Sequence, residues 1–281
     1  MRSKRYLTPF IALLAVIILM LSFAIGQVAG QEPGPSAPDQ DHSVYLPLAK
    51  KVPARIYGVV RDDGSVAPNV ILELHRLDVN TFADTLVDTT ISNSSGYFAF
   101  INEPSLPPDN VYYVRYYNPG DPTRLWRWYT RPLGTYFAGQ IVHIGDFDLA
   151  NIVLSLPANG AYVNLPETFS WVRRPATTSD NYEFDLFEDC DNCALFYTLP
   201  PLGYVGSYNL TTLPAGFNYN TLYFWEIWVY SGDGGYGISY DANGVTFTSS
   251  HMNAAPVKVL PEAVRERLEY KRLLRIVQAG P

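Results

Sequence analysis

The chain has 281 residues, of which 47% are hydrophobic, 14% are aromatic and only 17% are charged. A disordered chain carries more charge and fewer aromatic residues, so this composition indicates a packed, globular protein. The formal net charge of −7 excludes a nucleic-acid binder that works through bulk positive charge. Two cysteines exclude a disulfide-dense scaffold.

The N-terminus has the pattern of an export signal. Three basic residues among the first five are followed by an uncharged, largely aliphatic stretch that reaches Gln31. This pattern is typical of a signal peptide, and the apolar run is also long enough to be retained as a membrane anchor. We expect residues 1–30 to be one or the other, with the rest of the chain exported. Residues 31–52 are rich in proline near their start and are expected to form a flexible linker.

Between residues 52 and 248 the sequence shows no helical period. Short runs of alternating apolar residues are separated by Gly, Pro, Asn and Asp, which is the pattern of an all-β protein. The expected fold is two tandem β-sandwiches, over residues 53–150 and 151–249, and the resemblances described next imply that both are immunoglobulin-like. Because the join between them is short, we expect little freedom of movement.

Four motifs in the first expected sandwich follow one another in a familiar order. Gly58 stands in the first strand and an Asp-Gly turn follows at 63–64, then come alternating aliphatic residues at 70–74 and Gly96 before Tyr-Phe-Ala-Phe. These motifs resemble a carboxypeptidase regulatory-like domain, which is an immunoglobulin-like sandwich. The resemblance implies a structural or binding module without catalytic residues of its own.

The second expected sandwich carries a different set of motifs. A Leu-Pro opening at 156–157 precedes Trp171 on the second strand, and a Tyr-x-Trp motif begins at Tyr223. This set resembles a fibronectin type III-like domain. The resemblance implies that Trp171 is buried between the sheets and that the hydroxyl of Tyr223 bonds to nearby backbone.

Cys190 and Cys193 form a C-x-x-C motif in an acidic loop. In an exported chain this spacing favours a small disulfide, and the flanking acids would make a poor thiol nucleophile. A zinc site needs about four ligands, and the sequence offers neither a second C-x-x-C motif nor a histidine pair. We therefore expect a disulfide here, and no metal, cofactor or catalytic residue in the protein.

The most suggestive stretch for binding reads Arg-Leu-Trp-Arg-Trp-Tyr at 124–129. In an extended strand Trp126 and Trp128 would share one face, and with Arg127 and Tyr129 they are the candidate ligand-binding residues. An exposed row of rings would stack on sugars or anchor a partner protein. The alternative is a sandwich core or a ladder of aromatic side chains across strands.

Residues 250–281 are expected to form a tail with an amphipathic helix. Apolar residues recur at helical spacing from Val264 to Val277, and positions 258–275 hold six basic residues against three acidic ones. Such a helix either docks on the sandwich or stays solvated, or it binds a partner or an anionic surface.

Together these features predict a non-enzymatic extracellular or cell-surface binding or scaffolding protein, secreted or tethered by its N-terminus. The expected partner is an extracellular protein or a polysaccharide, and not a nucleic acid. The alternative is a carbohydrate-binding accessory protein that uses the Trp/Tyr platform.

Overall fold

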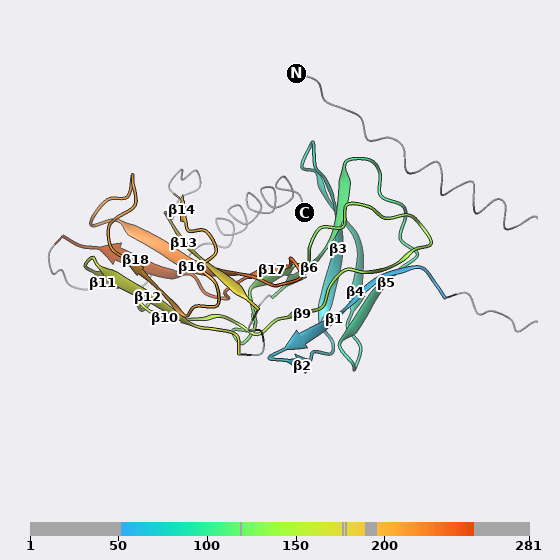
Figure 1. The fold of residues 1–281 in the computed structure, drawn as a ribbon, viewed down its shortest axis with the longest axis horizontal. Coiled ribbons are helices and arrows are strands. Elements are labelled where there is room, and N and C mark those ends of the chain that lie inside the picture. Colours follow the sequence, from blue (N-terminus) through green and yellow to red (C-terminus); the bar gives the residue numbers. More distant parts are fainter. Residues whose placement is uncertain (1–51, 119, 176, 178, 189–195, 250–281) are drawn as a thin grey trace, which may run out of the picture. The chain divides into compact units, whose positions relative to one another are not determined.

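The computed structural model of the protein describes residues 52–118, 120–175, 177, 179–188 and 196–249 (Figure 1). These residues form eighteen β-strands and no helix, so the all-β prediction is confirmed for this part of the chain. It follows that these ranges contain no helix able to cross a membrane. The predictions for the export segment, the linker up to residue 51, the C-x-x-C loop and the C-terminal helix lie outside the described residues.

Nine strands come from the first half of the described chain. They are β1 (Arg55–Asp62), β2 (Ser65–Val66), β3 (Ile71–Asp78), β4 (Asp84–Ile91), β5 (Tyr97–Ile101), β6 (Asn110–Tyr117), β7 (Arg127–Tyr129), β8 (Ile141–His143) and β9 (Phe147–Asp148). Strand β1 pairs antiparallel with β2 and β5 and parallel with β8 and β9. Strands β4, β3, β6 and β7 form a second, antiparallel layer.

Alternating side chains of these two layers meet in one core. Leu72 and Leu74 of β3 and Phe98 and Phe100 of β5 are fully or almost fully buried there. The glycine in the first strand has a steric reason. A Cβ atom at Gly58 would lie 2.1 Å from the carbonyl oxygen of Gly145 and 2.8 Å from the Phe98 ring, so no side chain fits.

Nine further strands come from the second half. They are β10 (Val153–Leu156), β11 (Ala161–Val163), β12 (Glu167–Val172), β13 (Asn181–Glu188), β14 (Phe196–Thr198), β15 (Ser207–Leu210), β16 (Leu222–Tyr230), β17 (Tyr236–Ile238) and β18 (Asn243–Phe247). Strands β10, β12 and β15 form a three-stranded sheet. The facing layer is built around β16, which pairs with β13, β17 and β18.

The two residue predictions made for this second half are confirmed. Trp171 of β12 is buried, and its ring meets Tyr182 of β13 edge to face, with ring centroids 6.2 Å apart. The Tyr223 hydroxyl accepts a hydrogen bond from the backbone N–H of Asn218 at 2.6 Å and donates to its carbonyl oxygen at 3.3 Å. This is the corner bond that the resemblance to a fibronectin type III-like domain implied.

One sheet runs through both halves of the chain. Strand β17 pairs with β16 on one side and with β7 on the other, with Tyr236 opposite Tyr129 and Gly237 opposite Trp128. The resulting ten-stranded sheet follows the path β11-β18-β16-β17-β7-β6-β3-β4, and off that path β13 pairs with β16 and β14 pairs with β13. We call it the long sheet. The described residues accordingly fall within one compact unit, although the boundary between residues 150 and 151 stays a prediction.

Candidate functional site

The structure buries the predicted aromatic platform. The exposed fractions of Trp126, Arg127, Trp128 and Tyr129 are 6%, 7%, 1% and 3%. The hypothesis that the two Trp side chains form an exposed row is therefore wrong, and the alternative of core packing and a cross-strand ladder describes them correctly.

The two indoles also lie on different faces of the long sheet. Trp126 stands at a bend just before β7, which breaks the alternation expected of a continuous strand. Trp128 faces the main core, where its ring stacks on Phe147 with centroids 5.6 Å apart and planes 11° apart. Trp126 belongs to a separate cluster on the opposite face, and the Arg127 guanidinium lies over its ring at 4.4 Å.

Trp128 also packs against the backbone of β17, and this contact joins the two halves of the chain. A Cβ atom at Gly235 would lie 2.7 Å from Cζ2 of Trp128, and one at Gly237 would lie 2.7 Å from Cε3. Both glycines are therefore needed for the indole to lie this close to the strand. On the ring's own face, the guanidinium carbon of Arg174 lies 5.2 Å from the centroid, a cation–π contact.

Arg174 anchors the same junction through a buried ion pair. Its Nε and one terminal nitrogen donate to the two carboxylate oxygens of Asp180 at 2.8 and 2.7 Å. Its other terminal nitrogen donates to the backbone carbonyl of Asp148, at the end of β9. Both charged side chains are almost completely buried. A bidentate pair inside a core fixes geometry, so these contacts hold the first half of the chain against the second.

The face of the long sheet that points away from the main core carries a row of rings. Tyr129 of β7 and Tyr236 of β17 stack at 4.9 Å, and Tyr236 stacks on Trp228 of β16 at 5.8 Å. Tyr113 of β6 continues the row, 5.8 Å from Tyr129. We call this the outer face. Its buried apolar cluster consists of Leu77, Tyr113, Trp126, Tyr129, Trp228, Tyr236 and Ile238.

At the β13–β16 end, the outer face changes from aromatic to acidic. Glu183 and Asp185 alternate along β13 with core residues, and Asp185 lies directly opposite Glu226 of β16. The three carboxylic residues are 6%, 0% and 2% exposed. Burial and the charge of Asp185 raise the pKa of the neighbouring Tyr230.

Near the β4 end of the long sheet, the outer face carries a network of opposite charges on β3, β4 and β6. Arg115 donates two hydrogen bonds to Glu73, at 2.9 and 2.7 Å, and the His75 ring lies between Glu73 and Asp84. Burial opposes ionisation of Glu73, but the hydrogen bonds from Arg115 and His75 hold its pKa below the usual value. These charged groups are thus bonded to one another.

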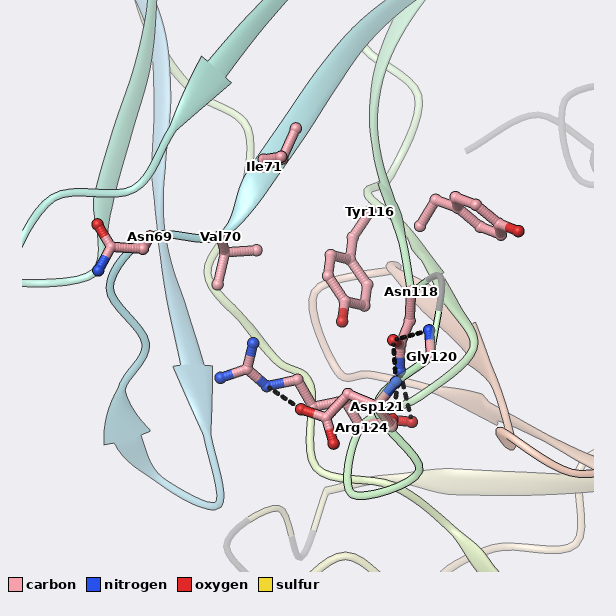
Figure 2. A pocket seen from close by; sticks show the side chains of 9 residues that line it. Asn69, Val70, Ile71, Tyr116, Asn118, Gly120, Asp121 and Arg124 are labelled. Atoms are coloured by element: carbon pink, nitrogen blue, oxygen red, sulfur yellow. Dashed lines mark hydrogen bonds and ion pairs between the residues drawn. The ribbon is translucent and has the colours of Figure 1, made fainter.

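A separate pocket of about 360 Å³ lies where β6 ends (Figure 2). Its floor is the loop after Asn118, whose amide oxygen accepts from the backbone N–H of Gly120 and Asp121. Arg124 on its wall donates to Asp62 at 2.7 Å and lies 3.8 Å from Asp121. Because Arg124 bonds to Asp62 of β1 and lies close to Asp121, these contacts hold the loop after Asn118 against β1.

One carboxyl has an unusual proton affinity. Burial raises the pKa of Glu103, and the charge of nearby Asp88 raises it further, to about 7. Glu103 follows β5 and lies near Tyr112 and Tyr136. No sequence motif marks this residue, because its burial depends on distant strands. Across the described ranges, His, Cys, Asp and Glu side chains form no group of three or more suited to a metal ion.

Comparison with known proteins gives no family for this chain. No family model matches it, and no curated protein does. Among solved structures, it is similar to a DUF3823 family protein from Bacteroides ovatus (11% identity, TM-score 0.25, 69% of this chain and 99% of that chain). It is also similar to a tandem-repeat region of a large adhesion protein (10%, 0.23, 70% and 50%). A third is a mutant of the shaft pilin spaA from Lactobacillus rhamnosus GG (11%, 0.26, 75% and 100%).

Identities and TM-scores this low carry no functional argument. The resemblances to carboxypeptidase regulatory-like and fibronectin type III-like domains accordingly stay predictions. The functional account below depends on the residues of this chain.

Proposed function

We propose that the protein is a non-enzymatic extracellular or cell-surface scaffold in which two β-sandwiches act as a single rigid body. The observation that carries this proposal is the long sheet, which crosses from one half of the chain to the other through β7 and β17. A protein that binds mainly through flexible loops does not need a continuous sheet between its two halves.

Charged groups that bond within the protein, buried or half-buried, support a structural role. Arg174 and Asp180 bond to each other, and Arg115 bonds to Glu73. Each of these groups stabilises a contact between strands or loops. The proposed partner is another extracellular protein or a polysaccharide, and the buried Trp126–Tyr129 stretch is not its docking site.

Localisation is tested with the full chain, expressed with its own N-terminus and carrying an epitope between Phe137 and Gln140, where the loop is exposed. Antibody labelling of intact cells, or recovery of the protein from the medium, is the expected result. Labelling only after permeabilisation would show that the chain is not exported and would overturn the proposal.

The partner class is tested by applying the exported protein to a glycan array and to immobilised extracellular proteins. Binding to protein surfaces supports the scaffold. If a defined glycan is bound instead, and that binding is lost when an exposed ring is removed, as in Tyr219→Ala, the alternative of carbohydrate binding is correct.

A further inference from the structure

We infer that the outer face of the long sheet is the docking surface for the chain's own C-terminal segment, residues 260–278. The inference combines the burial of that face, its charge and the sequence of the segment. It stands independently of the scaffold proposal, because it concerns only contacts within the chain.

The burial of the outer face requires a covering layer. Trp228, Tyr236 and Ile238 are no more than 1% exposed, and Trp126 is only 6% exposed. All described members of their cluster lie on strands of the long sheet or next to one of those strands. Within the described residues, the cluster is therefore a single layer of side chains on one face of the sheet. Side chains on one face of a sheet become this inaccessible only when another element lies on them.

The charge of the outer face selects the occupant. Three carboxylic residues, Glu183, Asp185 and Glu226, are buried together at its β13–β16 end, and Asp185 and Glu226 are direct cross-strand neighbours. Hydrogen bonds to Thr198 and to the Trp228 indole bring neutral donors to them. Like charges directly opposite each other destabilise a sheet, and buried carboxylates are stable when cations lie beside them.

Residues 260–278 have the matching chemistry. They hold five basic and three acidic residues among apolar ones. In a helix, Arg267, Lys271 and Arg275 recur at a spacing of four and lie on one side, together with Val264 and Leu268. That side of the helix offers cations to the carboxylates and apolar groups to the aromatic rings. Cations also bind well to the faces of Trp and Tyr.

The acidic residues of the segment fall on the other side. At 3.6 residues per turn, Glu262, Glu266 and Glu269 project away from the line of Arg267, Lys271 and Arg275. Two other segments outside the described residues fit less well. The C-x-x-C loop at 189–195 is acidic, and residues 6–31 carry no charge.

The lengths also agree. The described chain ends at Ser249, shortly after β18, where Thr246 pairs with Leu222 of β16. Glu226 lies four residues further along β16, or about 13 Å. The ten residues 250–259 can span roughly 33 Å when extended. A nineteen-residue helix is about 28 Å long, and the five strand spacings from β13 to β3 cover about 24 Å.

Hydrogen exchange of the full chain tests this assignment with two matched pairs of substitutions. The test variant is Lys271→Glu with Arg275→Glu, on the proposed docking side. The control is Arg265→Glu with Arg272→Glu, which makes the same charge change on another side of the same helix. We expect amides in 260–278 to be protected in the wild type, to exchange about tenfold faster or more in the test variant, and to change little in the control.

A compensating change sharpens the test. Glu226→Lys returns a cation to the acidic end of the outer face, so adding it to Lys271→Glu is expected to restore part of the protection that Lys271→Glu alone reduces. If a test variant fails to fold, Lys271→Gln with Arg275→Gln removes the charges without reversing them and gives the same comparison.

Three results would overturn the inference. Rapid exchange of 260–278 in the wild type would show that the segment does not dock. Equal loss of protection in test and control would show that the charged side does not select the face. Protection that disappears on dilution would assign the outer face to the tail of a second copy of the chain.

Discussion

Replacing Gly237 by alanine tests the packing that joins the two halves of the chain. The new Cβ atom would lie 2.7 Å from Trp128 Cε3 and from Leu125 Cδ1, and 3.1 Å from the Arg127 carbonyl oxygen. Carbon atoms prefer separations of about 3.5–4.0 Å, so either the indole or β17 must move. Overpacking of this kind lowers the free energy of unfolding by about 1–3 kcal/mol.

The matched control is Gly232→Ala, in the turn between β16 and β17. Its Cβ atom would find its nearest neighbours, atoms of Ser179, at an ordinary 3.6 Å. We expect a change within about 0.5 kcal/mol. Urea denaturation followed by circular dichroism measures both variants, with the midpoint compared at constant m-value.

A second substitution shows whether the clash is with Trp128. In Trp128→Phe the smaller ring leaves room for the alanine, so the double variant should lose less than the sum of the two single variants. The expected coupling is about 0.5–3 kcal/mol. Additive effects, or a Gly237→Ala variant as stable as Gly232→Ala, would refute the packing described here.

Three other substitutions give separate predictions. Asp180→Asn leaves the buried Arg174 guanidinium without its counter-charge and should cost about 3–5 kcal/mol in chemical denaturation, and an effect below 1 kcal/mol would mean that the pair is solvated. Tyr223→Phe removes the corner bonds and should cost about 1 kcal/mol, whereas no change would show that those bonds add nothing. The raised pKa of Glu103 means that its stabilising contribution is complete below about pH 4.5 and is lost as the pH rises to about 7. Glu103→Gln should therefore stabilise the protein by about 1–2 kcal/mol at pH 8 but not at pH 4, and equal stability of the two forms at both values would contradict the burial of this carboxyl.

Local sequence patterns were sufficient for the features that depend on neighbouring residues. Alternation predicted strands such as β3 and β13, and the motif positions of Trp171 and Tyr223 predicted their roles in the second sandwich. The strand predictions succeeded because the period of side chains along a strand is set by its own backbone, whereas the roles of Trp171 and Tyr223 came from the resemblance to a fibronectin type III-like domain.

The face and burial of the Trp126–Tyr129 stretch could not be predicted in the same way. The bend at Trp126 places the two indoles on opposite faces, and one of the two partner strands of β7 is β17, more than a hundred residues later in the chain. One local signal was present: Gly235 and Gly237 flank Tyr236, and glycine inside a strand marks close approach of another group. The indole of Trp128 is that group.

Differential scanning calorimetry of the full chain tests the central claim, that both sandwiches form one structural unit. At about 0.7 kcal/mol per residue, some 200 ordered residues unfold with a total enthalpy of roughly 140 kcal/mol. A joint sheet predicts a single transition whose van't Hoff enthalpy equals the calorimetric one. Two transitions, or a van't Hoff enthalpy near half the calorimetric value, would show that the halves unfold independently and would contradict the account.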